Sequence, residues 1–328
     1  MNTSLNFLFE QRILNSRYIL MDALGSGQTS TVFECLDKQT GESKVVKIYG
    51  DNERLTFQKE SAVNQKISEI NSPYHIKCYE SGIGFLIEKE KKMKKMHAIL
   101  ELGNNGSLFD AVKKTKNGFS EDVCKFLLLQ ILNAVHDLHK NGICHRDLKT
   151  ENMIFVGRNY DLKLLDFGFS TKFLKKNNKK KKLKRRLGTP YYYAPEILEG
   201  KDYDGVQIDI FSIGALLFVL MTRNFGFYEA KIYNVSSNDK SKYILYNLIK
   251  EKKYVQYWEI IEKTFKIVIT SQKFKELYQK LVAYEPEERP SIEKIKNDEW
   301  MYDITNASPE HLTFLRNKMI SEINLKNP

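Results

Sequence analysis

Hydrophobic and polar residues follow different patterns in the two parts of this chain. Before residue 103, short runs rich in β-branched and apolar residues are separated by glycine-containing turns, which is typical of strands. The expected strands are residues 18–24, 31–37, 43–49 and 97–102. Apolar residues from Phe57 to Ile70 recur at helical spacing and predict a helix over 55–70. The pattern therefore predicts a small β-rich lobe with one main helix.

After a flexible connector at 103–106 the pattern becomes helical. An apolar stripe runs from Val123 to Leu138, and Ser120 before it is a favourable N-cap residue. Strand-like pieces return at 153–156 and 162–165, and helical patterns dominate from 209 onward. The apolar run 210–221 is too short to cross a bilayer and is expected to be a buried helix. The fold class expected is α+β, with a second, larger and mostly helical lobe.

Composition and cysteine usage place the chain among ordinary globular proteins. Its 328 residues are enough for two lobes. Hydrophobic residues make up 42% and charged residues 28%, which is ordinary for a globular protein. The N-terminus shows no signal-peptide pattern, and Asn2 excludes N-myristoylation. The four cysteines are scattered: Cys35, Cys78, Cys124 and Cys144. We expect free thiols and a reducing compartment, the cytoplasm or the nucleus.

The positive charge of the chain is local. The formal net charge is +11, but residues 172–186 carry ten Lys or Arg and no acid, which leaves +1 for the rest. A surface that is basic throughout, as in a general nucleic-acid-binding protein, is therefore not expected.

A glycine-rich turn joins the first two expected strands. It reads Leu24-Gly25-Ser26-Gly27-Gln28-Thr29-Ser30-Thr31-Val32. Glycines let a backbone approach phosphate oxygens and offer them N–H groups, although a hairpin without a ligand has the same composition. A Rossmann site or a Walker loop would open a helix instead. Lys47 ends the next strand, where it could neutralise phosphates, and Glu60 on the following helix could pair with it.

A more specific pattern lies in the second part of the chain. Cys144-His145-Arg146-Asp147-Leu148-Lys149-Thr150-Glu151-Asn152 precedes two strand-like pieces, and Asp166-Phe167-Gly168 follows them. Phosphoryl transfer needs a carboxylate that positions a hydroxyl, and Mg²⁺ prefers hard oxygen ligands. Asp147 suits the first task, while Asn152 and Asp166 suit the second.

Together these motifs resemble those of the eukaryotic protein kinase superfamily from about Tyr18 to Trp300. The resemblance implies a bilobal kinase fold and a reaction that uses ATP and Mg²⁺. It implies Asp147 as catalytic base, Lys149 as a cation at the transferring phosphoryl group, Asn152 and Asp166 as Mg²⁺ ligands, and a Lys47–Glu60 ion pair. Residues implied around the nucleotide are Leu24, Gly25, Ser26, Gly27, Val32, Val45, Lys47, Leu100, Glu101, Gly103, Glu151 and Ile154.

The resemblance also implies a substrate class. Asp147-Leu148-Lys149, together with Gly188-Thr189-Pro190, looks like a Ser/Thr kinase, in which Thr189 would hydrogen-bond Asp147 and Lys149. The run 187–196 is most similar to the calcium/calmodulin-dependent and calcium-dependent kinase group, although no EF-hand loop is present. Ala194-Pro195-Glu196 would end the activation segment, with Arg289 as the partner of Glu196.

Several positions depart from the family pattern. Ser30 replaces the usual third glycine, and Val45 replaces the usual alanine over the adenine. Glu60 lies only 13 positions after Lys47, so that Asn64 falls where an apolar residue is usual. Glu53 is an alternative partner for Lys47.

The basic stretch 172–186 falls inside the expected activation segment. It is interpreted either as a solvated insertion or as a patch for nuclear localisation or an acidic partner. Many kinases order this segment by phosphorylating a residue that pairs with the Arg of His-Arg-Asp, but residues 184–187 contain no hydroxyl. We expect activity without phosphorylation there, with order supplied by the run 191–193 or by an anionic partner. Ser170 and Thr171 are the hydroxyls early in the segment.

Glu151 matches a position that contacts basic residues in substrates, so protein substrates with Lys or Arg near the phosphosite are expected, although Ser107 stands where a second acid is usual. The alternatives are a pseudokinase scaffold, a kinase of small molecules, and a nucleic-acid binder that uses the basic stretch.

The expected domain division is an extension over 1–17, a kinase domain over 18–302 (N-lobe 18–102, hinge 101–106, C-lobe 107–302) and a tail over 303–328. The tail is expected to form one helix at 311–323, with Leu312, Leu315 and Met319 on one face.

Overall fold

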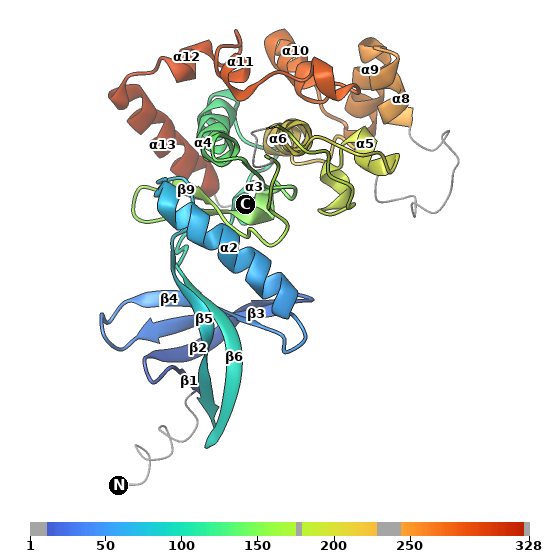
Figure 1. The fold of residues 1–328 in the computed structure, drawn as a ribbon. Helices are drawn as coiled ribbons and strands as arrows, with labels where there is room; N and C mark the ends of the chain where they lie inside the picture. The colour runs from blue at the N-terminus through green and yellow to red at the C-terminus, as the bar shows by residue number, and fades with distance from the viewer. Residues whose placement is uncertain (1–11, 175–178, 228–243, 325–328) are drawn as a thin grey trace. The chain divides into compact units, whose positions relative to one another are not determined.

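The structure is a computed structural model that describes residues 12–174, 179–227 and 244–324. By its internal contacts the chain forms two compact units, residues 1–104 and 105–328 (Figure 1). The first unit contains the β-rich part and the second is mostly helical. The α+β fold class and the division into a small β-rich part and a larger helical part are confirmed.

The first unit is a closed antiparallel barrel with the strand order β1-β2-β3-β4-β6-β5. The strands are β1 Arg12–Leu14, β2 Tyr18–Ser26, β3 Ser30–Asp37, β4 Ser43–Tyr49, β5 Cys78–Glu88 and β6 Lys91–Leu100. The three strands predicted before residue 50 are confirmed. The strand predicted at 97–102 was too short, because β6 begins at Lys91 and pairs with β5 over its whole length.

Strand β1 begins the sheet at Arg12, inside the stretch expected to be an extension. It pairs with β2 and also with β5, where Ile13 lies opposite Ile87. Leu14 is completely buried in the barrel core together with Tyr18 and Leu86. A run of only three residues carries too little pattern to be recognised, but its pairing on both sides closes the barrel.

Gly84 explains part of why β5 was missed. An added Cβ at this position would lie 2.0 Å from Oδ1 of Asn15. Asn15 donates its backbone N–H to the carbonyl of Phe85 at 2.9 Å, and its Oδ1 accepts the N–H of Phe85 at 2.9 Å. Glycine therefore makes room for a side chain that caps the strand pair, although glycine weakens the strand pattern in the sequence.

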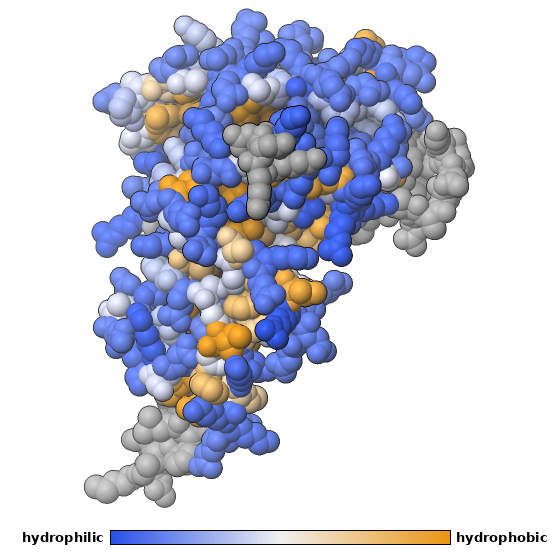
Figure 2. All heavy atoms as spheres, viewed as in Figure 1, coloured by the Kyte–Doolittle hydropathy of each residue, from blue (hydrophilic) through white to orange (hydrophobic). Residues whose placement is uncertain are grey.

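The outer face of β5 is unusually apolar. Ile83, Phe85 and Ile87 are all exposed, while Lys94 and Lys92 lie opposite Phe85 and Ile87 on β6. Hydrophobic patches interrupt the mostly hydrophilic surface of the β-rich unit in Figure 2. The alternation of apolar and polar residue types is therefore lost in the sequence of β5, although burial still alternates along the strand.

Helix α2, Arg54–Ile70, confirms the predicted helix. Its buried residues include Phe57, Val63 and Ile67, and Phe57 packs edge-on against Tyr49 of β4. The helix ends where Asn71 adopts a left-handed conformation and donates its N–H to the carbonyl of Ile67.

The second unit contains the remaining elements. The helices are α3 Leu108–Lys114, α4 Glu121–Lys140, α5 Pro195–Leu198, α6 Gly205–Thr222, α8 Ile244–Lys250, α9 Tyr254–Phe265, α10 Gln272–Leu281, α11 Ile292–Lys296, α12 Tyr302–Thr305 and α13 Pro309–Asn324. Short 3₁₀ turns are η1 Thr150–Asn152, η2 Pro190–Tyr192 and η4 Pro286–Glu288. The strands form two pairs, β8 Met153–Val156 with β9 Asp161–Leu164 and β10 Thr171–Lys172 with β7 Ile143–Cys144.

Helices α4 and α6 form the centre of this unit. The apolar stripe predicted along α4 is buried from Val123 to Leu138. Helix α6 would qualify as a membrane span by length and composition, but 83% of it is buried inside the unit. It is therefore the buried core helix that the sequence predicted.

Helix α13 packs beside α4 and shows that the tail is part of the helical unit (Figure 1). Leu315, Met319 and Ile323 are buried, whereas the predicted Leu312 is only half-buried. The carboxylate of Glu322 accepts the N–H of Ser120 at 3.0 Å. Ser120 is the N-cap of α4, so the tail helix also caps the central helix.

Candidate active site

A loop in the second unit carries the residues expected for catalysis, and a buried carboxylate holds it. Arg146 has φ of 69°, a left-handed conformation that costs energy in a non-glycine residue. Asp209 of α6 is completely buried and accepts the backbone N–H of His145 and of Arg146, each at 2.8 Å. Asp209 also contacts Nε2 of His139 at 2.8 Å. The strained backbone is thus fixed by two hydrogen bonds to a charged group.

The sequence predicts only helical patterns from residue 209 onward and no role for Asp209. The motif Asp209-Ile210-Phe211-Ser212 was the available signal. The contact with the loop could not be inferred, since Asp209 lies 62 positions after Asp147 in the chain.

Asp147 stands at the centre of a compact polar cluster. Its side chain is buried, with 5% of the residue exposed. Oδ1 accepts the hydroxyl of Thr189 at 2.8 Å, and Oδ2 lies 2.9 Å from Nζ of Lys149. Lys149 also donates to the hydroxyl of Thr189 at 2.9 Å. A carboxylate, a cation and a hydroxyl from two separate segments therefore meet, as the sequence led us to expect.

Asn152 and Asp166 have the chemistry of a divalent-metal site. Asn152 is buried, and its Nδ2 donates to the backbone carbonyl of Asp147 at 2.8 Å and to Oδ2 of Asp147 at 3.1 Å. Because the amide nitrogen of Asn152 is hydrogen-bonded to Asp147, the amide oxygen is the atom that would coordinate a cation. Asp166 is exposed and left-handed, with φ of 61°. The oxygens of an amide and a carboxylate fit Mg²⁺.

A closed all-protein metal cage is absent from the part of the chain that the structure describes, because no group of three His, Cys, Asp or Glu side chains occurs there. Mg²⁺ in nucleotide enzymes is usually held by one or two protein ligands together with phosphates and water. The pair Asn152 and Asp166 has that composition.

Phe167 anchors the segment that carries Asp166. Its side chain is buried, and its ring packs edge-on against His145 with centroids 5.6 Å apart. His145 belongs to the same loop as Asp147. The two motifs that carry oxygen ligands are therefore packed against each other.

Lys47 and Glu60 form an ion pair in the first unit. Nζ of Lys47 lies 2.7 Å from Oε1 of Glu60, and both side chains are buried, with 10% and 3% exposed. The alternative acid, Glu53, instead accepts the hydroxyl of Thr56 at 2.7 Å at the start of α2. Asn64 is buried, so an amide does occupy the position where an apolar residue was expected.

The glycine-rich turn is open at its two glycines. A Cβ added to Gly25 would meet no atom within 4 Å, and at Gly27 the nearest atom would be the carbonyl of Ser30 at 3.9 Å. Packing within the chain therefore does not require glycine here, and the space beside both glycines would allow a ligand to approach the backbone closely. Leu24 is 53% exposed, whereas Val45 is buried and Val32 is half-buried.

The remaining expected nucleotide residues lie in both units. Leu100 ends β6, and the N–H of Glu101 donates to the carbonyl of Lys77 at 2.9 Å. The N–H of Glu101 is thus engaged inside the chain, so an adenine would be met by its carbonyl. Gly103 is the second-last residue of the first unit, whereas Glu151 and Ile154 belong to the second. Glu151 is exposed, and Ile154 is half-buried on β8.

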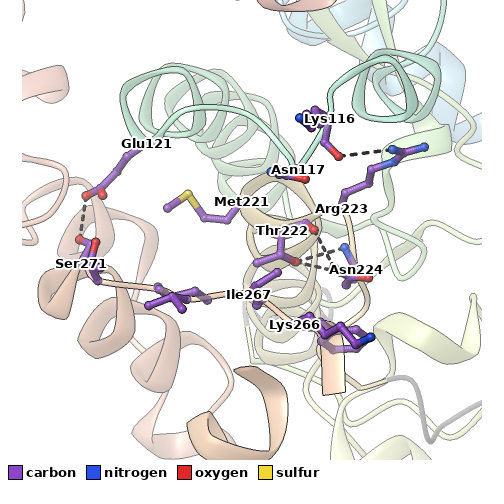
Figure 3. Close-up of a pocket in the computed structure, with 14 residues that line it drawn as sticks. Lys116, Asn117, Glu121, Met221, Thr222, Arg223, Asn224, Lys266, Ile267 and Ser271 are labelled. Atoms are coloured by element: carbon purple, nitrogen blue, oxygen red, sulfur yellow. Dashed lines mark hydrogen bonds between the residues drawn. The ribbon is translucent and has the colours of Figure 1, made fainter. Parts of the chain in front are cut away.

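A pocket of about 630 Å³ in the second unit contains none of these residues (Figure 3). It is lined by the start of α4, the end of α6 and the connection between α9 and α10. Glu121 in its wall accepts the hydroxyl of Ser271 at 2.8 Å. The residues expected to transfer phosphate therefore lie outside this pocket.

A buried ion pair joins two distant segments. Arg289 donates through Nη1 and Nη2 to the two carboxylate oxygens of Glu196, at 2.7 and 2.8 Å. Both residues are buried. This is the partnership that the sequence led us to expect.

Residues 18–301 match the protein kinase domain family. The chain belongs to this family. The kinase chain is 31% identical over 310 residues to the human SNF-related serine/threonine-protein kinase, a match that covers 93% of this chain and 36% of the relative. It is 31% identical over 304 residues to calcium-dependent protein kinase 5 of Plasmodium berghei (91% and 47% covered). It is 29% identical over 289 residues to rice CBL-interacting protein kinase 11 (88% and 52% covered).

These relatives agree with the kinase group suggested by residues 187–196. The kinase chain spans between about a third and about a half of their length.

Proposed function

We propose that this kinase is active and transfers the γ-phosphate of ATP to serine or threonine hydroxyls of proteins. The observation that carries the proposal is the contact of Asp147 with Lys149, Thr189 and Asn152, all within 3.1 Å. A scaffold without turnover would not need a carboxylate, a cation and a hydroxyl held in this arrangement.

The proposed chemistry follows from these atoms. The substrate hydroxyl oxygen attacks the γ-phosphorus, and the bond to the oxygen bridging the β- and γ-phosphorus atoms breaks. Asp147 orients the hydroxyl and accepts its proton. Lys149 offsets the negative charge of the transferring group, and Thr189 holds both side chains in position.

The proposed contacts with ATP follow from the residues of each unit taken by itself. Lys47, fixed by Glu60, would contact the α- and β-phosphates, and the open glycine turn would offer N–H groups. Asn152 and Asp166 would hold Mg²⁺, which supplies charge neutralisation to the phosphates when bound. The apolar residues proposed around the adenine are Leu24, Val32, Val45, Leu100 and Ile154, with the backbones of Glu101 and Gly103.

Substrate preference and location are further parts of the proposal. The exposed carboxylate of Glu151 favours substrates with Lys or Arg near the phosphosite. The basic stretch 172–186 favours an acidic partner, and the free thiols favour the cytoplasm or the nucleus. A peptide array in which basic residues make no difference would contradict the substrate preference.

The decisive experiment is radiolabel transfer from Mg-ATP to a generic basic protein, with Asp147→Asn as the control. We expect phosphoserine or phosphothreonine with the wild type and none with Asp147→Asn. ATP binding without transfer in the wild type would instead indicate a pseudokinase.

A further inference from the structure

The basic activation segment is tied to the helical unit at several points. Thr171 pairs with Cys144, and Leu174 forms a bridge with Lys180. Further on, Leu183 and Tyr203 exchange two backbone hydrogen bonds, at 2.8 and 2.9 Å. The described part of the segment is therefore held by backbone pairing at these points, while most of its Lys and Arg side chains are exposed; residues 175–178 lie outside the described residues.

The side chain of Tyr203 joins this segment to the catalytic loop. Tyr203 is buried, and its hydroxyl donates to the backbone carbonyl of Arg185 at 2.6 Å. The same hydroxyl accepts from Nη1 of Arg146 at 3.3 Å. Burial raises the pKa of Tyr203, so the hydroxyl keeps its proton at neutral pH. Arg146, directly before Asp147, also donates through Nε to the carbonyl of Phe169 at 2.7 Å.

The acidic residues on either side of Tyr203, Asp202 and Asp204, pair with lysine side chains of the activation segment. Lys184 pairs with Asp202 at 3.4 Å, and Lys180 pairs with Asp204 at 3.1 Å. The lysine side chains are more than half exposed, so each pair adds little stability by itself. The two ion pairs hold these lysine side chains against Asp202 and Asp204. The segment itself contacts the Tyr203 hydroxyl through the backbone carbonyl of Arg185.

Kinases that are switched on by phosphorylation order this segment through a phosphorylated residue that pairs with the corresponding arginine. Residues 184–187 offer no hydroxyl for such a phosphate. We infer that Tyr203 is a positioning residue that replaces the phosphorylated side chain: its hydroxyl links Arg146 to the activation segment and makes phosphorylation of the segment unnecessary. This inference rests on the proposed kinase activity.

The test compares Tyr203→Phe with Tyr278→Phe in the full chain, after phosphatase treatment and with the absence of phosphate verified by mass spectrometry. Tyr278 is a matched control because its buried hydroxyl bonds Tyr257, at 2.6 Å, in the core of the helical unit. For Tyr203→Phe we expect kcat to fall about tenfold, while KM for ATP stays within about twofold, because only the link to the catalytic loop is lost. Tyr278→Phe should keep the wild-type kcat.

Amide hydrogen exchange provides a readout that needs no activity. Residues 180–187 should exchange faster in Tyr203→Phe than in the wild type and in Tyr278→Phe. If the wild type transferred no more phosphate than Asp147→Asn, the proposed function would fail while hydrogen exchange still tested the link. Equal exchange and equal kcat in the two tyrosine variants would overturn the inference. So would loss of wild-type activity on phosphatase treatment, restored by phosphate within residues 170–193.

Discussion

At the scale of single residues, Asp37 shows how the barrel depends on a buried charge. Its side chain has no exposed surface, and it accepts Nε and Nη2 of Arg17 at 2.8 and 2.7 Å and Nζ of Lys44 at 2.6 Å. These bonds, that of Arg17 foremost, hold the pKa of Asp37 well below its usual range. A lowered pKa in the folded state stabilises the fold above the unfolded-state pKa, and this contribution is lost as the pH falls.

We therefore predict that acid destabilises the first unit through Asp37. The melting temperature of the wild type should fall steeply below about pH 4, the pKa of an unperturbed aspartate. In Asp37→Asn, stability should be lower at neutral pH and change less with acid. Asp51→Asn is the control, because Asp51 pairs with Lys95 but is 74% exposed. Thermal unfolding at a series of pH values measures the effect, and parallel profiles for all three proteins would contradict it.

The Lys47–Glu60 pair gives a prediction about nucleotide affinity. Glu60→Gln removes the charged partner of a buried ammonium, so Lys47 loses its fixed position. We expect KM for ATP to rise about tenfold, since one charge-assisted contact is weakened. Glu53→Gln should leave KM unchanged, as Glu53 contacts Thr56 instead. Equal KM values for the two variants would exclude Glu60 as the partner that matters.

At the scale of elements, the pair Glu196–Arg289 should be a major stabilising contact between α5 and the turn after η4. Glu196→Gln leaves the guanidinium of Arg289 buried without a charged partner, which costs about 3–5 kcal/mol. Glu288→Gln removes an exposed pair with Lys252, which solvent screens, and should cost much less stability. Urea unfolding measures both, and similar losses would show that burial of the pair is unimportant.

The tail helix α13 should contribute to the stability of the helical unit. Met319→Ala removes a completely buried side chain and should cost about 2–5 kcal/mol. Phe314 lies on the same helix but is 59% exposed, so Phe314→Ala should change stability by less than about 1 kcal/mol. If thermal unfolding shifts equally in both variants, the packing of α13 does not stabilise the unit.

Elements with strong periodicity could be predicted from the sequence, and those that depend on distant partners could not. Helix α4 was recognised because its apolar stripe repeats along the helix. Strand β5 was not predicted, because its glycines and outward-facing apolar residues obscure the alternation of apolar and polar residues in its sequence. Strand β10 spans only two residues and exists through its pairing with β7.

In the candidate active site, too, residues close in sequence could be predicted, whereas contacts with distant parts of the chain could not. Asp147, Lys149 and Asn152 lie within one short motif, so sequence order alone brought them together. The support that Asp209 and Tyr203 give to the loop depends on how α6 and the segment before it pack.

At the scale of the whole molecule, the basic stretch should dominate behaviour on charged surfaces. Replacing Lys179, Lys180, Lys181 and Lys182 by glutamine removes four of ten clustered positive charges. We expect a marked loss of retention on a cation exchanger. Four Lys→Gln changes at positions 89, 91, 92 and 94, where Glu88 and Glu90 are interspersed, should reduce retention less. Equal shifts would mean that only net charge matters.

The link through Tyr203 has a consequence for how such an enzyme is controlled. Its contacts use only side chains and carbonyls of the chain itself, so they form as folding finishes. Under the inference above, an enzyme assembled in this way would be active without phosphate on this segment, and removing phosphate from the segment would not inactivate it. As far as this segment is concerned, the amount of active enzyme would then follow the amount of folded protein rather than a reversible modification of the segment.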